Sequence, residues 1–163
     1  MQNLNVVPTS TSRETNNTSG PISLSEDQGR RKKIVLIDDD KDCQAIFQAM
    51  GNSIGVDVQV YGSLAEMPSF AQLQQYDVAI FDYFLETFIG TEIAQYVDAF
   101  FPSLPVVIIS SKELNSEEQN WPSCVKGFFN KNLGPIEIIK QSLKEVEKVN
   151  FYEQFKTPNL SYS

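Results

Sequence analysis

Histidine is absent from all 163 residues of the sequence. Its absence excludes Ser–His–Asp and Cys–His catalysis, and it excludes zinc sites built on imidazole. It also means that no histidine of this chain can carry a phosphoryl group. Chemistry in this chain therefore has to use carboxylates, hydroxyls, lysines and a metal ion that prefers oxygen ligands.

Cysteine and long apolar runs are also scarce. The two cysteines, Cys43 and Cys124, are too few for a disulfide framework or a four-cysteine zinc site. No apolar run approaches the roughly 20 residues that a membrane span requires. The first ten residues have neither the basic start nor the apolar stretch of a secretory signal. We therefore expect a cytoplasmic protein with free thiols and no membrane span.

Positive charge is in deficit, with 13 Lys and Arg residues against 21 Asp and Glu residues and a net charge of -8. Sequence-independent binding of nucleic acid needs cationic side chains that displace counterions from phosphates. The charge balance therefore argues against a nucleic-acid partner. Hydrophobic residues make up 41% of the chain, which is enough for one packed core.

Composition divides the chain into three parts. Residues 1–31 are expected to form a flexible polar leader, because eleven of the first twenty are Ser, Thr or Asn. Residues 32–149 have the alternating pattern of a folded domain. Residues 150–163 form a short tail, too short for a DNA-binding or enzymatic output domain. Output would then pass through protein contacts or onward transfer of a phosphoryl group.

Strand and helix patterns alternate along the middle part. Short β-branched or apolar runs predict strands at residues 34–37, 56–61, 78–81, 106–109 and 125–130. Apolar residues at helical spacing predict helices at residues 40–50, 91–101 and 135–149, the first of them ended by Gly51. This alternation predicts an α/β fold, with a doubly wound parallel sheet of five strands and helices on both faces.

Two further helices are weaker predictions. The spacing from Ser63 to Glu66 fits a capping box, and Pro68 indicates that the helix there starts late or kinks. Residues 113–120 offer little apolar surface beyond Leu114, so this fourth helix is the thinnest of the set. We expect it to give the protein an unusual or mobile output face.

Polar residues stand at the carboxyl ends of four predicted strands. The first strand ends in Asp38-Asp39-Asp40, the third in Asp82, the fourth in Ser110-Ser111 and the fifth in Lys131. Ligands of parallel sheets bind outside these ends, so the side chains are expected to converge. Clustered acids repel one another unless a cation joins them, and oxygen ligands without histidine favour Mg²⁺. A lysine beside a carboxylate indicates a bound anion such as a phosphoryl group.

This arrangement resembles the CheY-like receiver domain of two-component response regulators, over roughly residues 32–149. The resemblance implies a flavodoxin-like sheet with strand order 2-1-3-4-5. The matching residues are the acidic pair Asp38 and Asp39, the phospho-acceptor Asp82, Gly90 before the third helix, the hydroxyl residue Ser110, the switch aromatic Phe128 and the lysine Lys131. Each motif alone is weak, and the four strand ends together form a strong joint signal.

The resemblance also implies a mechanism. Asp82 would accept a phosphoryl group from a histidine kinase or a histidine phosphotransfer protein. Asp39, Asp82 and the backbone carbonyl of Phe84 would hold Mg²⁺, with Asp38 acting through water. Lys131 and Ser110 would contact the phosphoryl oxygens. The chain would be a single-domain signalling module that catalyses at most its own phosphorylation and dephosphorylation.

The switch that the resemblance implies begins at Ser110. Its inward movement would let Phe128 rotate and change the face formed by the fourth helix, the fifth strand and the fifth helix, where an unknown protein partner would bind. Two positions, Phe84 and Lys112, tune loss of the phosphoryl group in this family. A phenylalanine cannot orient an attacking water and its ring can shield the acyl phosphate, so we expect slow self-hydrolysis.

The sequence also departs from the family. Glu86 and Asn132 stand where receivers usually have proline. Two other interpretations stay open. A haloacid-dehalogenase-like phosphatase would use Asp38-x-Asp40 as its first motif, but this leaves Asp82 unexplained. A degenerate receiver that only binds partners would be expected to have lost an acid, the serine or the lysine. Taken singly, Asp38 also fits a helix N-cap.

Overall fold

The structure is a computed structural model that describes residues 29–86, 88–113 and 120–155. The chain divides into two units, Met1–Arg30 and Arg31–Ser163, and the fold below is that of the second. The predicted leader lies almost wholly outside the described residues. So do residues 114–119 of the predicted fourth helix and residues 156–163 of the tail.

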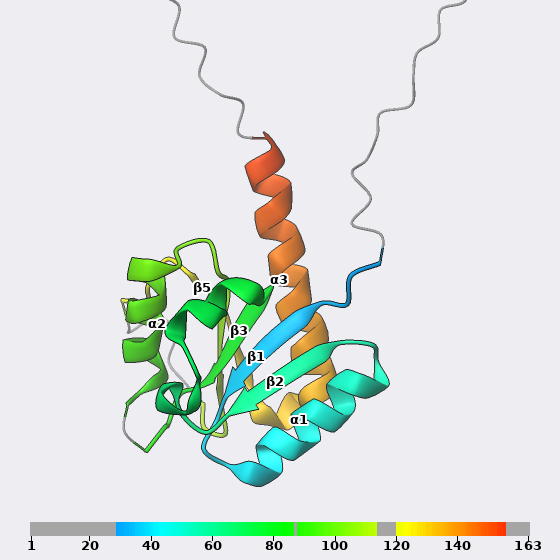
Figure 1. The fold of residues 1–163 in the computed structure, drawn as a ribbon, viewed down its shortest axis with the longest axis vertical. Coiled ribbons are helices and arrows are strands. Elements are labelled where there is room, and N and C mark those ends of the chain that lie inside the picture. Colours follow the sequence, from blue (N-terminus) through cyan, green and yellow to red (C-terminus); the bar gives the residue numbers. More distant parts are fainter. Residues whose placement is uncertain (1–28, 87, 114–119, 156–163) are drawn as a thin grey trace, which may run out of the picture. The chain divides into compact units, whose positions relative to one another are not determined.

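Five parallel strands form one sheet in the order β2-β1-β3-β4-β5, which confirms the predicted fold (Figure 1). The strands are β1 (Lys33–Ile37), β2 (Asp57–Tyr61), β3 (Val78–Asp82), β4 (Val106–Ser110) and β5 (Val125–Asn130). The three central strands β1, β3 and β4 are buried along almost their whole length. Burial on both faces explains why their sequences are continuous apolar runs without polar alternation.

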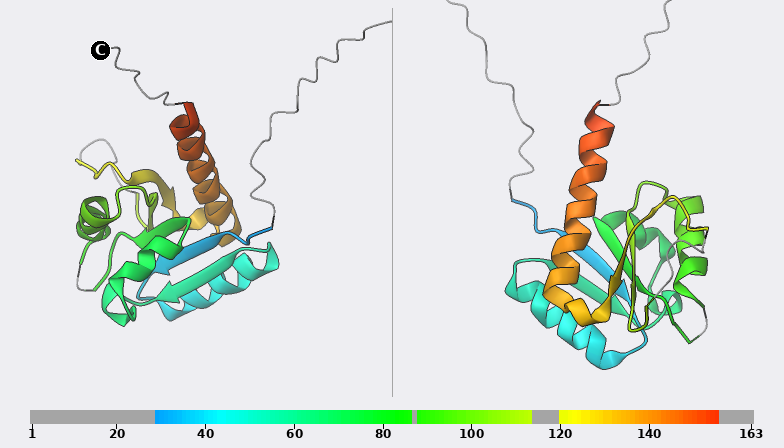
Figure 2. Two further views of the ribbon diagram at one scale, coloured as in Figure 1. Left: turned by 45° about the horizontal axis from the view of Figure 1, so that its top comes forward. Right: turned by 180° about the vertical axis from the view of Figure 1, so that it is seen from behind.

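Helices cover both faces of the sheet (Figures 1 and 2). One layer contains α1 (Lys41–Ser53) and α3 (Pro135–Phe155), which pack on Ile34 and Leu36 of β1 and on the matching side of β3 and β4. The other layer contains α2 (Gly90–Phe100) and two 3-10 segments, η1 (Leu64–Glu66) and η2 (Phe70–Gln75). Val35 and Ile37 belong to the core of this second layer, because successive residues of a strand face opposite sides.

The prediction that Gly51 ends the first helix is wrong, because α1 continues through it to Ser53. Gly51 is buried, and a Cβ atom there would overlap a methyl group of Val58 on β2. This glycine therefore permits close packing of α1 on the sheet. The turn that follows the helix uses Gly55 instead, whose φ of 78° suits glycine.

The capping box predicted at Ser63 is also wrong. The Ser63 side chain makes no capping hydrogen bond, and the Glu66 carboxylate accepts the backbone N–H of Gly62 at 2.7 Å. The segment forms the two short turns η1 and η2, separated at Pro68, in place of one helix. Ser69 starts the second turn by accepting the N–H of Ala71 at 3.2 Å. The interruption predicted at Pro68 is therefore present, and no α-helix forms beside it.

The last two α-helices lie close to their predicted positions. Helix α2 starts one residue before the predicted Thr91, and α3 starts at Pro135 as expected. Helix α3 then runs to Phe155, six residues beyond the predicted end at Val149. In the part of the chain that the structure describes, no helix combines the length and the apolarity of a membrane span.

Candidate functional site

The carboxyl ends of β1, β3 and β5 meet at one edge of the sheet. The register pairs Ile37 with Phe81, so the next residues, Asp38 and Asp82, stand level with each other. The Lys131 ammonium follows β5 and donates to both carboxylates, at 2.8 Å to Asp38 Oδ2 and 2.9 Å to Asp82 Oδ2. The structure thus brings together three residues from three strands that sequence reasoning selected separately.

Asp38 is completely buried, and its surroundings fix it in place. Its Oδ1 atom accepts the backbone N–H of Asp40 at 3.0 Å, and its Oδ2 atom accepts from Lys131. The Gln44 side-chain amide donates to its backbone carbonyl. Asp40, not Asp38, is the N-cap of α1, because its Oδ1 atom accepts the N–H groups at the start of the helix. The interpretation of Asp38 as the N-cap of this helix is therefore wrong.

Asp39 completes a cluster of acids around this edge. It is half-buried, and one carboxylate oxygen each of Asp38, Asp39 and Asp82 lies within 4.8 Å of the others. Three carboxylates at this separation repel one another unless a cation joins them. Such a donor set, without nitrogen or sulfur, fits Mg²⁺ better than zinc or copper.

The electrostatics of the site follow from burial and from the shared lysine. Burial raises the pKa of the Asp82 carboxyl, and the hydrogen bond from Lys131 offsets part of that rise. Burial lowers the pKa of the Lys131 ammonium, but its bonds to Asp38 and Asp82 outweigh this and leave the pKa above its usual range. The lysine therefore stays charged at neutral pH, although its side chain is only 21% exposed.

The loop after β3 is held close to Asp82. The Phe84 N–H lies 3.4 Å from Asp82 Oδ1, and Phe84 forms an isolated antiparallel bridge with Ile89. A Cβ atom on Gly90 would lie 2.7 Å from the backbone oxygen of Asp82. Only glycine permits this approach of the start of α2, which gives a steric reason for the glycine noted in the sequence.

Ser110 ends β4 at the same edge and is 1% exposed. Its hydroxyl oxygen accepts the backbone N–H of Lys112 at 3.0 Å. The Lys112 ammonium lies 4.8 Å from the centroid of the Phe84 ring, a cation–π contact. The two positions expected to tune phosphoryl loss thus contact each other beside the site. Sequence reasoning missed this contact, because it joins two loops that follow different strands.

Phe128 on β5 is half-buried and packs against the only tryptophan of the chain, with ring centroids 4.2 Å apart. Trp121 in turn contacts Tyr83, the residue after Asp82, at 6.2 Å. A cavity of about 310 Å³ has Ser110 and Phe128 among its lining residues. An aromatic chain therefore connects the loop after β3 to β5, and sequence reasoning did not assign Trp121 to it.

The loop that carries Lys131 keeps its shape without the usual proline. The Asn130 side chain accepts the N–H of Asn132 at 2.9 Å, a bond that proline could not make. Gly134, with φ of 81°, then turns the chain into α3. An Asx-type turn thus positions Lys131, with Asn132 in place of the proline that usually follows the family lysine.

A family model described as the response regulator receiver domain matches residues 34–142. No curated protein matches the sequence. The structure of a CheY-like receiver domain protein from Methanospirillum hungatei JF-1 is similar, at 15% identity, with a TM-score of 0.63 and coverage of 76% of this chain and 99% of that one. The chemotaxis response regulator CheY4 of Vibrio cholerae is similar at 19% identity, with a TM-score of 0.61 and coverage of 72% and 99%.

The structural likenesses support the fold, and the family model covers most of the sheet and the site at its edge. The chain belongs to the response regulator receiver domain family.

Proposed function

We propose that the chain is a response regulator receiver that accepts a phosphoryl group on Asp82. The observation that carries the proposal is the Lys131 ammonium held between the carboxylates of Asp38 and Asp82. A fixed cation beside a nucleophilic carboxylate offsets charge on an incoming phosphoryl group. Because these 163 residues contain no histidine, the phosphohistidine donor would lie outside them, in a histidine kinase or a histidine phosphotransfer protein.

In the transfer step, an Asp82 carboxylate oxygen attacks the phosphorus atom of the donor. The new O–P bond forms as the P–N bond breaks, and the imidazole nitrogen keeps the electron pair of the broken bond. Lys131 moves from the Asp82 carboxylate to a phosphoryl oxygen while it keeps its bond to Asp38. The buried hydroxyl of Ser110 donates to another phosphoryl oxygen.

The same residues fit a divalent cation. Asp39, Asp82 and the backbone carbonyl of Phe84 are the proposed direct ligands of Mg²⁺. Asp38 would act through water, as the family resemblance implies, and its two oxygens accept from the Asp40 N–H and from Lys131. When bound, the ion neutralises negative charge on the transferring group.

Readout starts at Ser110 and passes to Phe128. When the hydroxyl moves toward the phosphoryl group, Phe128 turns into the space near Ser110 and its contact with Trp121 changes. The proposed output surface combines β5, α3 and the segment at residues 113–120, most of which lies outside the described residues. A protein partner in the cytoplasm would bind this surface, and we propose no nucleic-acid partner because the net charge is -8.

Two observations weigh against the alternatives. A phosphatase of the haloacid-dehalogenase type would need Asp40 at the reacting centre, but this side chain caps α1 and is exposed. A receiver that only binds partners would not need a charged lysine shared between two acids. Incubation of the full chain with acetyl phosphate and Mg²⁺, followed by intact mass measurement, tests all three.

The proposed function predicts one added phosphoryl group, which Asp82→Asn abolishes and Asp40→Asn leaves in place. Labelling that survives Asp82→Asn and is lost in Asp38→Asn would favour the phosphatase. No labelling and no response to beryllofluoride would favour the binding-only receiver.

A further inference from the structure

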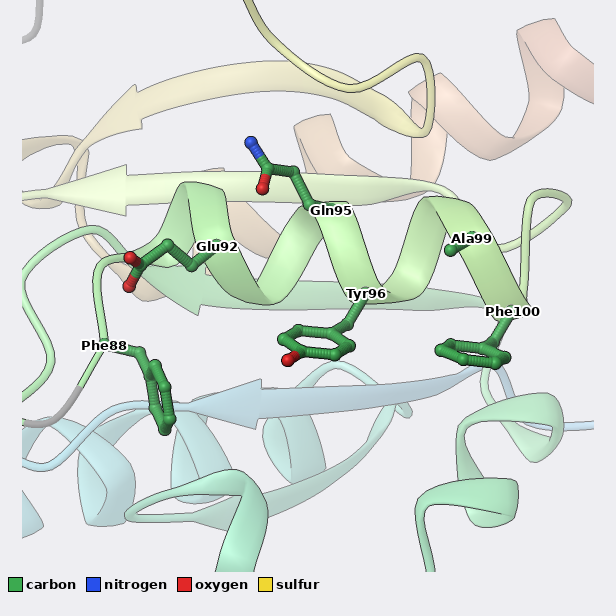
Figure 3. A pocket seen from close by; sticks show the side chains of 6 residues that line it. All are labelled: Phe88, Glu92, Gln95, Tyr96, Ala99 and Phe100. Atoms are coloured by element: carbon green, nitrogen blue, oxygen red, sulfur yellow. The ribbon is translucent and has the colours of Figure 1, made fainter.

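Exposed aromatic side chains gather along one side of α2. Phe88, Tyr96 and Phe100 are 49%, 57% and 66% exposed. Figure 3 shows their rings in a row on the same side of the helix. Leu64 of η1 and Phe70 of η2 form the opposite wall. These five residues define what we call the α2 groove.

The α2 groove consists of two adjoining hollows that share lining residues. One part, of about 390 Å³, lies between α2 and the 3-10 turns, and a second of about 430 Å³ continues along the outer side of α2. Phe88, Tyr96 and Phe100 line both parts. The apolar surface of three large rings that lie exposed side by side is removed from water only when another molecule covers them. Such patches mark interaction sites.

The α2 groove is bordered by η1 and η2, which form two short turns in place of one helix. The turns on either side of Pro68 bury Leu73 but leave Leu64 and Phe70 half-buried. Phe70 reaches α2 edge-on, with ring centroids 6.5 Å from Phe100 and 5.2 Å from Phe101. These contacts place Phe70 beside the carboxyl end of α2.

Charge restricts what can fill the groove. No lysine or arginine occurs between Lys41 and Lys112, and the seventy residues between them contain eight Asp or Glu residues. Glu92 lines the groove directly and is exposed. A further hollow adjoins the groove at Phe88, and Glu66, Glu86 and Asp39 line it. Lys41 also lines this hollow, and its ammonium lies 3.8 Å from a carboxylate oxygen of Glu66. The surroundings are therefore apolar and acidic together.

We propose that the α2 groove binds an amphipathic helix of a partner protein, with apolar anchors at helical spacing and flanking Lys or Arg side chains. Tyr96 and Phe100 are four residues apart on α2, which is the spacing that meets the apolar stripe of a second helix. Helix α2 has 11 residues and so is about 16 Å long, enough for two to three turns of a partner. An anionic membrane surface would be repelled by the same acids.

This surface is separate from the proposed output face of β5 and α3, and its use needs no phosphoryl group. It does adjoin the acid cluster, because Phe88 lines both the groove and the hollow that contains Asp39. A basic helix seated here would therefore place positive charge beside the phosphorylation site.

NMR titration of the ¹⁵N-labelled full chain tests the proposal without any phosphodonor. The probe is a helical peptide of about four turns made of Leu and Lys at amphipathic spacing, with a second peptide that carries Glu in place of Lys. We expect amide shifts centred on Phe88, Tyr96 and Phe100, and at least about tenfold tighter binding of the Lys peptide. Tyr96→Ser and Phe100→Ser should each weaken binding by about tenfold or more.

Ile46→Ser on α1 is the matched control, because Ile46 is 51% exposed and lies outside the groove. It should bind the Lys peptide as the wild type does, and all variants should keep the wild-type spectrum elsewhere. Equal binding of both peptides, shifts centred elsewhere, or no binding at millimolar peptide would overturn the proposal. So would concentration-dependent shifts of α2 without peptide, which indicate a second copy, or NOEs from residues 1–28 to Tyr96, which indicate the protein's own leader.

Discussion

Replacement of Lys131 by methionine should destabilise the protein, because it leaves two acids without their shared cation. Methionine keeps most of the apolar stem of lysine and removes the ammonium. Asp38 has no exposed side-chain surface and Asp82 has 9%, so neither carboxylate can regain full hydration. Lys131→Met therefore isolates the electrostatic role of this residue from its packing.

The magnitude follows from the burial of the three groups. Removal of one partner from a fully buried ion pair costs about 3–5 kcal/mol. The Lys131 side chain retains 21% exposure, and water can reach the site where its ammonium stood, which lowers the cost. We expect a loss of about 2–3 kcal/mol in the free energy of unfolding. In urea this is a midpoint shift of about 1 M, for a slope of about 2 kcal/mol per M.

Urea unfolding followed by far-UV circular dichroism at pH 7 measures this loss. The pKa of Lys131 is raised on folding, so its stabilising contribution is complete below the unfolded pKa of about 10.4 and is lost as pH rises beyond it. The difference from wild type should therefore be the same at pH 7 and pH 9. Lys126→Met, which replaces an exposed lysine on β5, is the control and should change stability by less than about 0.5 kcal/mol.

The double variant Lys131→Met/Asp38→Asn identifies the cause. If the cost comes from a buried carboxylate left unpaired, neutralising that carboxylate should recover about half of the loss or more. A Lys131→Met protein as stable as the control, or a double variant less stable than the single one, would refute this reasoning.

Three further outcomes follow from the site. Burial raises the pKa of the Asp82 carboxyl, so its negative charge lowers the stability of the folded protein above the unfolded pKa. Asp82→Asn should therefore be more stable than wild type in urea at pH 7, and the difference in free energy of unfolding should shrink toward pH 4. A difference that grows on acidification would contradict this. Gly90→Ala should lower the free energy of unfolding by about 1–3 kcal/mol in the same assay, because the new Cβ atom would lie 2.7 Å from the Asp82 backbone oxygen. Unchanged stability would show that the loop shifts freely. Phe84→Asn should speed loss of the phosphoryl group from purified phosphoprotein in Mg²⁺ by about tenfold. The amide can orient an attacking water, and the ring contacted by Lys112 is removed. An unchanged rate would contradict the shielding role of Phe84.

The sheet and its edge were predictable from the sequence, because each strand signal lies within one short segment and burial on both faces of a central strand restricts every residue of it. Runs such as Val106–Ile109 must be apolar throughout, since both faces of a central strand are buried. Parallel topology then brings every carboxyl end to one edge. Residues as distant as Asp38 and Lys131 could therefore be assigned to one site before any coordinate was known.

The predictions that failed depend on tertiary contacts that one segment does not encode. A glycine near a helix end has two physical roles, termination and close packing, and only the position of Val58 shows that Gly51 has the second. The Ser63–Glu66 spacing fits a capping box, but the Glu66 carboxylate bonds the N–H of Gly62 instead. The α2 groove was not predicted, because it depends on how the turns around Pro68 sit against α2.

The central claim is that Asp82 is the residue that accepts the phosphoryl group, and peptide mapping tests it most directly. Borohydride reduction converts an aspartyl phosphate to homoserine and so marks the acceptor stably. Trypsin cleaves after Lys41 and next after Lys112, so it separates Asp82 from Asp38, Asp39 and Asp40. After treatment with acetyl phosphate and Mg²⁺, we predict homoserine at Asp82 alone, in the peptide at residues 42–112. Homoserine in the peptide at residues 34–41, or in neither peptide, would contradict the account.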